Sequence, residues 1–198
     1  MTVRDQLLAL QWTQLKHDEA YHKDVVILPL AQRIKHMALH NAKYTAHLFE
    51  VAETGDEARL IKTLTDAFII SLASANTLNQ DLGGELGEAA VAATSLPALG
   101  ADLTVELARS DADPLWLVRA FARQNGQLAK ACESWDHLES VPFRDLMRSC
   151  NVAILKAVLV EASARELDLA EAYRARIREV ETRSIFDGHY REGAGGEA

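Results

Sequence analysis

The chain has 198 residues, of which 48% are apolar and 25% are charged, a composition typical of a globular protein rather than a disordered one. Its net charge of -8 argues against wrapping nucleic acid, which needs a basic stripe, and leaves room for a local basic pocket. The two cysteines, Cys132 and Cys150, lack metal-type spacing and indicate a reducing, cytoplasmic location. The longest apolar stretch, residues 67–75, is about half of the ~20 residues that a membrane-spanning helix requires, so we expect no membrane segment.

The N-terminal residues carry a helix signal. Thr2, followed three residues later by Asp5, resembles a capping box, and leucines at helical spacing then predict a helix over residues 3–20. Residues 24–28 form a β-like run, but Pro29 closes the run and no partner strand is visible. We therefore expect an extended lead-in at this point.

Two long helices complete the first half of the chain. Pro29 suits the first turn of a helix and Gly55 breaks the pattern, which predicts a helix over residues 30–53. Asp56 can cap a further helix that runs to about Gln80 and is apolar on most sides. We expect this second helix at the buried centre of the first half.

The second half has a similar organisation after a connector rich in glycine and small residues. Pro114 lies in the first turn of a predicted helix that runs towards Trp135, Pro142 opens another, and residues 168–185 form a last amphipathic helix. The sequence thus predicts an all-α helical bundle. Its expected parts are an N-terminal helical half over 1–82, a connector with short helices over 83–113, a C-terminal helical half over 114–186 and a flexible tail over 187–198.

An internal sequence similarity suggests that the two halves are related. Residues 65–76 and 151–163 each form a very apolar segment with small residues near its end. Each segment is followed by an Asp-Leu pair, at Asp81 and at Asp168, and each follows a long amphipathic helix across a polar turn. A tandem duplication explains this similarity, and the alternative is that any two buried helices look alike.

Three stretches of sequence resemble the MazG-like, all-α nucleoside triphosphate pyrophosphohydrolases. They are "LASANTLNQDL" over 72–82, "NGQLAKACE" over 125–133 and "VEASARELDL" over 160–169. The resemblance covers residues 30–82 and 114–184 and rests on helix patterning more than on rare residues. It implies two tandem MazG-like halves, a nucleotide ligand, a homodimer and a magnesium-dependent reaction that releases pyrophosphate.

The acidic motif of that family is mostly missing. The family holds magnesium with Glu-x-x-Glu on one helix and Glu-x-x-Asp on the next, because this hard cation needs several converging oxygen ligands. Asp66 matches the final aspartate, but Thr63 stands three residues before it, and Tyr44 and His47 replace the first pair. The corresponding positions of the second half are Ala131, Ser134 and Ala153. We therefore expect a divergent or inactive enzyme with little magnesium-dependent hydrolysis.

A row of basic residues is the most distinctive local pattern. His36, His40, Lys43 and His47 are spaced by four, three and four, which places them on one helix face that borders the apolar stripe. Three imidazoles could bind zinc, iron or nickel. Because Lys43 would repel a metal, the row could instead face the phosphates of a nucleotide. A packed polar boundary without a ligand is the third interpretation.

Two polar residues on the very apolar helix are further candidates. Asp66 could act as a metal ligand or base, or could form a surface pair with Lys62 one turn away. Asn76 could contact a base or ribose, or could form an inter-helix hydrogen bond. Glu19-x-x-His22 has the spacing of a ferritin-like iron motif, but the sequence holds no second copy.

The sequence-based hypothesis is a MazG-like nucleotide-binding protein. Asp66 is its candidate catalytic residue, and Lys43 and Asn76 are its candidate substrate-binding residues. Its candidate metal ligands, for magnesium, manganese or zinc, are His36, His40, His47 and Glu50. The alternatives are a non-enzymatic helical adaptor or assembly protein and a helical metalloprotein that uses the histidine row.

Overall fold

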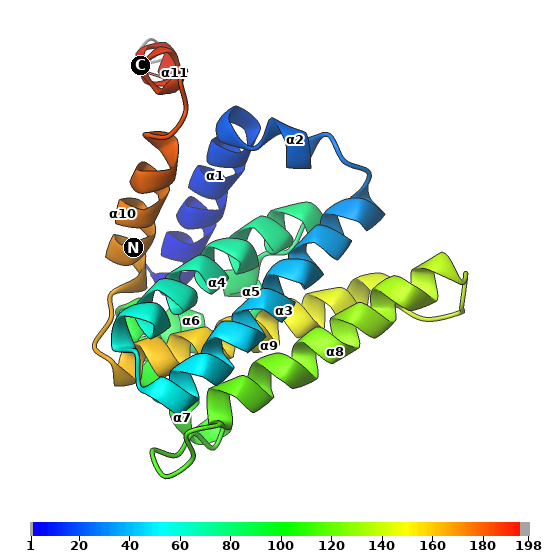
Figure 1. Ribbon diagram of the computed structural model, residues 1–198. Coiled ribbons are helices and arrows are strands. Elements are labelled where there is room, and N and C mark those ends of the chain that lie inside the picture. Colours follow the sequence, from blue (N-terminus) through cyan, green and yellow to red (C-terminus); the bar gives the residue numbers. More distant parts are fainter. Residues whose placement is uncertain (1, 195–198) are drawn as a thin grey trace.

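The computed structural model describes residues 2–194 and shows eleven helices and no strand over that range, which confirms the all-α prediction (Figure 1). The helices are α1 (Val3–Tyr21), α2 (Lys23–Val26), α3 (Leu30–Thr54), α4 (Glu57–Leu78), α5 (Leu82–Glu85), α6 (Glu88–Ala92), α7 (Leu96–Glu106), α8 (Trp116–Asp136), α9 (Phe143–Ala164), α10 (Leu169–Glu181) and α11 (Asp187–Ala194). Among the residues described, no helix combines the length and apolarity needed to cross a membrane.

Local sequence signals set the ends of the main helices. Thr2 and Asp5 form the capping box of α1, because each side chain accepts a hydrogen bond from the backbone N–H of the other residue. Gly55 ends α3 with a φ of 69°, a left-handed conformation that favours glycine. Asp56 then caps α4 by accepting a hydrogen bond of 3.0 Å from Arg59 N.

Two expectations about local structure differ from the observed chain. Residues 24–28 were expected to be extended, but residues 24–26 belong to the single-turn helix α2, because a short β-branched run without a partner strand satisfies its backbone groups within one helical turn. Residues 187–194 of the expected flexible tail form α11, and residues 195–198 lie outside the described part.

Four long helices form the central bundle. The hairpin of α3 and α4 packs against the hairpin of α8 and α9, with α3 against α8 and α4 against α9. On the outside of this bundle, α1 and α10 cover α4, and α7 covers α9 (Figure 1). Phe68, Leu155 and Tyr173 are each at most 1% exposed, and they belong to one apolar core that joins residues of both halves. Burial of this core is the main stabilising contribution to the fold.

The two apolar helices end in the same backbone arrangement. Gln80 N donates to Ala75 O, and Leu167 N donates to Ala162 O, both at 2.9 Å. In each case the Asp-Leu pair follows, and the aspartate caps the next helix, as Asp168 does for α10. The similarity in the sequence therefore has a structural basis at these turns, and superposition of the two helix pairs stays a prediction.

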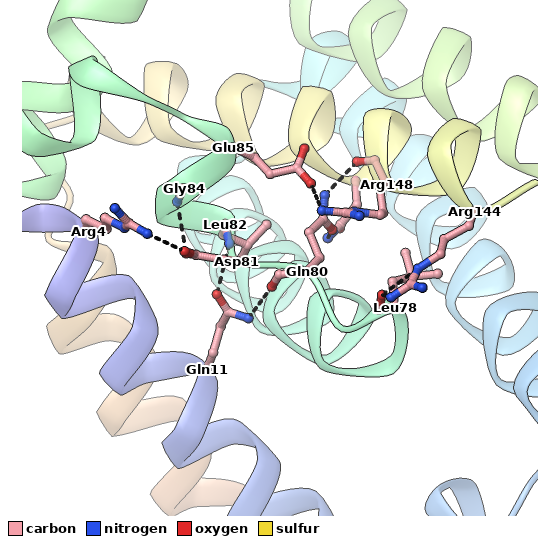
Figure 2. A network of polar contacts seen from close by, with 11 residues as sticks. Arg4, Gln11, Leu78, Gln80, Asp81, Leu82, Gly84, Glu85, Arg144 and Arg148 are labelled. Atoms are coloured by element: carbon pink, nitrogen blue, oxygen red, sulfur yellow. Dashed lines mark hydrogen bonds and ion pairs between the residues drawn. The ribbon is translucent and has the colours of Figure 1, made fainter. Parts of the chain in front are cut away.

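Polar side chains fix the turn after α4 (Figure 2). Gln11 of α1 donates to Gln80 O at 2.7 Å and accepts from Leu82 N at 3.1 Å. Gln80 in turn donates to Arg148 O of α9 at 2.9 Å, and Arg144 donates to Leu78 O, also at 2.9 Å. These bonds tie α1 and α9 to the same turn and satisfy buried backbone groups that would otherwise be costly.

Candidate functional site

A pocket of about 260 Å³ opens between α1, α2, α3, α4 and α10. Helix α4 packs against α1, α3 and α10, so these helices supply most of its walls. Figure 1 shows how α2 carries the chain from the end of α1 across to the start of α3. The polar residues that line the pocket are Gln14, His17, Asp18, His22, Arg33, His36, His40, Lys43, Tyr44, Asp66, Asn76, Thr77 and Arg176.

The wall formed by α1 and the residue after it carries three side chains of the kinds that bind metal ions. Donor atoms of His17, Asp18 and His22 all lie within 4.8 Å of one another. His17 Nδ1 lies 3.2 Å from Glu181 Oε1 of α10. A carboxylate accepts at this position, so Nδ1 carries the hydrogen and Nε2 keeps its lone pair for a metal ion. The three side chains together form a candidate metal centre of two imidazoles and one carboxylate.

Burial controls the protonation of this centre. His17 is 5% exposed, and burial lowers the pKa of its imidazole, although the hydrogen bond with Glu181 opposes the shift. Burial raises the pKa of the Asp18 carboxyl to about 6, although the 2.8 Å hydrogen bond from Gln14 Nε2 and the nearby His22 lower it. A buried, unpaired carboxylate is costly, and a bound cation would remove that cost.

The wall formed by α3 carries a hydrogen-bonded histidine pair. His36 Nε2 and His40 Nε2 are 3.1 Å apart, and Lys43 Nζ lies 3.3 Å from His40 Nδ1. An ammonium group can only donate, so His40 Nδ1 accepts and His40 Nε2 carries the hydrogen that it donates to His36. Burial, followed by the charges of Lys43 and His36, lowers the pKa of His40 to about 4. The imidazole of His40 is therefore neutral near pH 7.

This low pKa makes stability depend on pH. The unfolded chain binds a proton at His40 with an ordinary pKa of 6.5, whereas the folded chain does so only near 4. The contribution of His40 to the free energy of unfolding is therefore fully present above about pH 6.5 and is lost as the pH falls towards about 4. We expect the loss from His40 to be about 1–2 kcal/mol, discounted for its partial exposure.

The comparison that isolates His40 is urea unfolding of the wild-type chain and of His40→Gln between about pH 7 and pH 4.5. The variant should lose less stability over this range than the wild type, because glutamine does not titrate. His17 contributes in the same direction and Asp18 in the opposite one, and both are common to the two proteins. Parallel curves for the two proteins would contradict the assignment.

Asp66 pairs with an arginine of another helix. Arg176 of α10 donates to its two carboxylate oxygens through Nε at 2.7 Å and Nη2 at 3.3 Å. The alternative of a surface pair with Lys62 was wrong, because the packing of α10 on α4 brings Arg176 to the carboxylate. The side chains of Asp66 and Arg176 are 19% and 17% exposed. The charge of Asp66 is thus already balanced within the fold.

We expect Asp66→Asn to lower the free energy of unfolding by about 1–2 kcal/mol, because the shielded guanidinium of Arg176 loses its counter-charge. Urea denaturation of the purified variant measures this loss. Glu171→Gln is the matched control, since it removes one charge from the exposed pair with Arg174 on the same helix and should change stability by less than about 0.5 kcal/mol. Equal midpoints for Asp66→Asn and the wild type would show that the pair is not stabilising.

The remaining predicted residues lie in different surroundings. Asn76 lines the pocket, and its amide donates to Gln11 O at 2.8 Å, an inter-helix hydrogen bond. His47 does not line the pocket, and its ring packs at 6.4 Å from that of Tyr44. Glu50 forms an ion pair with Arg59 across the turn between α3 and α4. Of the predicted metal set, only His36 and His40 reach the pocket.

The sequence did not identify the metal-type cluster of α1. Positions 17 and 22 are five residues apart, and this spacing does not keep two residues on one face of a regular helix. The helix ends at Tyr21, and His22 takes a non-helical conformation with φ of -127° and ψ of 42°. The one signal was Glu19-x-x-His22, but Glu19 pairs with Lys16 at 3.0 Å and lies outside the pocket lining.

No family model matches the chain, and comparisons with curated proteins and with solved structures likewise gave no match.

Proposed function

We propose that this chain is a helical metalloprotein that binds one divalent first-row transition-metal ion through His17 Nε2, Asp18 and His22. The observation that carries the proposal is the convergence of their donor atoms within 4.8 Å in the lining of a pocket. Two imidazoles and one carboxylate suit zinc or iron(II) better than magnesium. Three protein ligands leave a coordination position for water or a ligand, which is typical of a catalytic site rather than a closed structural one.

The surroundings of the three ligands support the same proposal. Glu181 holds His17 Nδ1, and Gln14 donates to Asp18, so two ligands are oriented by neighbouring side chains. Metal sites commonly have such supporting hydrogen bonds, which fix the tautomer and direction of each ligand. A bound metal ion would also favour the charged form of Asp18.

Metal titration tests the proposal. Protein stripped with a chelator should bind about one zinc ion per chain in competition with a chromophoric chelator, and its melting temperature should rise with zinc concentration. Cobalt(II) should show d–d absorption of a low-coordinate nitrogen and oxygen site. The proposal fails if zinc, cobalt(II), iron(II) and manganese(II) all leave the melting temperature unchanged and none is retained on gel filtration.

A MazG-like nucleotide-binding function is the second candidate. It is supported by the bundle of two helix hairpins and by the presence of Asp66, Lys43 and Asn76 in one pocket. Magnesium binding at Asp66 would have to displace Arg176, so we propose nucleotide binding with little magnesium-dependent hydrolysis. A thermal-shift titration with nucleoside triphosphates and magnesium tests it, and an unchanged melting temperature would count against it.

A further inference from the structure

Two cations line the α3 wall of the pocket without a carboxylate partner. Arg33 and Lys43 form no ion pair with any residue that the structure describes. Among the other charged groups of the pocket, Arg176 pairs with Asp66, and the carboxylate of Asp18 is the one that the proposed metal ion would neutralise. In a chain with a net charge of -8, this wall is a local site of excess positive charge.

Buried polar atoms in the pocket also lack hydrogen-bond partners. Arg33 Nε is a buried donor without an acceptor, and Gln14 Oε1 is a buried acceptor without a donor. Gln14 is only 1% exposed, and both side chains line the pocket. An unsatisfied buried polar group costs about 1–3 kcal/mol, so a native structure normally supplies a partner. Because both atoms are covered, a small rotation of each side chain must accompany the binding of a ligand that offers an acceptor to Arg33 and a donor to Gln14.

The rest of the lining is apolar. It includes Leu15, Val25, Val26, Ile69, Ile70 and Ala73. The volume of about 260 Å³ fits a small organic molecule rather than a polymer segment. An ion alone would leave this apolar surface in contact with water, whereas a molecule with an apolar body would cover it.

We propose that the pocket binds a small amphipathic acid, with its oxyanion on the Arg33 guanidinium and its apolar body against α2 and α4. A hydroxyl or amine of the same molecule donates to Gln14 Oε1. The oxyanion is a carboxylate or a phosphate monoester, because a guanidinium forms paired hydrogen bonds with either group. Lys43 strengthens the binding through its charge from further along the same helix. Any coordination of the same acid by the proposed metal ion rests on the proposed function, whereas its contact with Arg33 does not.

Calorimetric titration tests the inference with three probes that share a phenyl ring. Mandelate carries a carboxylate and a hydroxyl, phenyl phosphate carries a phosphate, and 1-phenyl-1,2-ethanediol replaces the carboxylate of mandelate by a neutral alcohol. We expect at least one of the two acids to bind, and the diol to bind at least about tenfold more weakly. The tighter of the two acids identifies the head group. Failure of both acids to bind, or equal binding of the diol, would overturn the inference.

Variants locate the contact. Arg33→Met should weaken binding of the acid by about tenfold or more. Lys43→Met should weaken it by a few-fold and should make the affinity less dependent on salt concentration. Lys62→Met is the matched control, because Lys62 is exposed, forms no ion pair with the described residues and lies outside the pocket lining. Arg33→Lys, which keeps the charge but not the paired donors, should bind with intermediate affinity. Wild-type affinity in a folded Arg33→Met variant would overturn the inference.

The same titrations separate this inference from the metal proposal. Both the zinc-loaded and the metal-free protein should bind the acid in an Arg33-dependent manner, and the zinc-loaded form should bind it more tightly. Arg33-dependent binding in a protein that takes up no metal would refute the metal centre and support the acid site. Stoichiometric zinc binding without binding of either acid would support the metal centre and refute the acid site.

Discussion

Replacing His17 by glutamine should abolish stoichiometric zinc binding. The variant loses one of three proposed ligands, and an amide is a much poorer ligand for zinc than an imidazole. Loss of a supporting group outside the ligand set typically costs about 10–100-fold in metal affinity, so loss of the ligand itself should exceed about 100-fold. Competition with a chromophoric chelator measures the affinity, and circular dichroism checks that the helical content is unchanged.

Two further variants make this result specific to the proposed centre. Glu181→Gln should lower zinc affinity by about 10–100-fold, because it removes the charge that holds His17 Nδ1 but leaves all three ligands in place. His47→Gln removes an imidazole that lies outside the pocket lining and should leave zinc affinity unchanged. Retention of tight zinc binding by His17→Gln, or its loss in His47→Gln, would refute the assignment of ligands.

Helical periodicity and caps were sufficient to predict most of the long elements. The capping box of Thr2, the glycine stop at Gly55 and the cap at Asp56 each act within a few residues of sequence, so their effect can be read without tertiary structure. The short helix α2 was not predictable in this way, because a run of four residues gives no period.

The candidate site was only partly predictable for a related reason. His36, His40 and Lys43 share one helix face, so their spacing alone indicated that they lie together. The pairs of Asp66 with Arg176 and of His17 with Glu181 join residues 110 and 164 positions apart. Such contacts depend on the packing of α10 against α4 and α1, which no local pattern contains.

The packing of the outer helices relates the pocket to the repeat-like organisation of the chain. Helix α1 precedes the hairpin of α3 and α4 and packs on α4, and helix α7 precedes the hairpin of α8 and α9 and packs on α9. In the first case α2 separates the outer helix from the hairpin, and the pocket lies among these helices. In the second case α7 lies directly against α9, and the two backbones are in contact. Gly100 of α7 makes that contact.

Gly100→Ala should therefore lower the free energy of unfolding by about 3 kcal/mol. A Cβ at this position would lie 2.2 Å from Leu159 O and 2.8 Å from the Cβ of Ser163, so α7 would have to move away from α9. The matched control is Gly126→Ala on α8, where an added Cβ has no neighbour within 4 Å. This control should raise stability by about 0.5–1 kcal/mol, because alanine favours a helix interior. Chemical denaturation measures both variants, and a stabilising effect of Gly100→Ala would show that α7 does not pack on α9 at this distance.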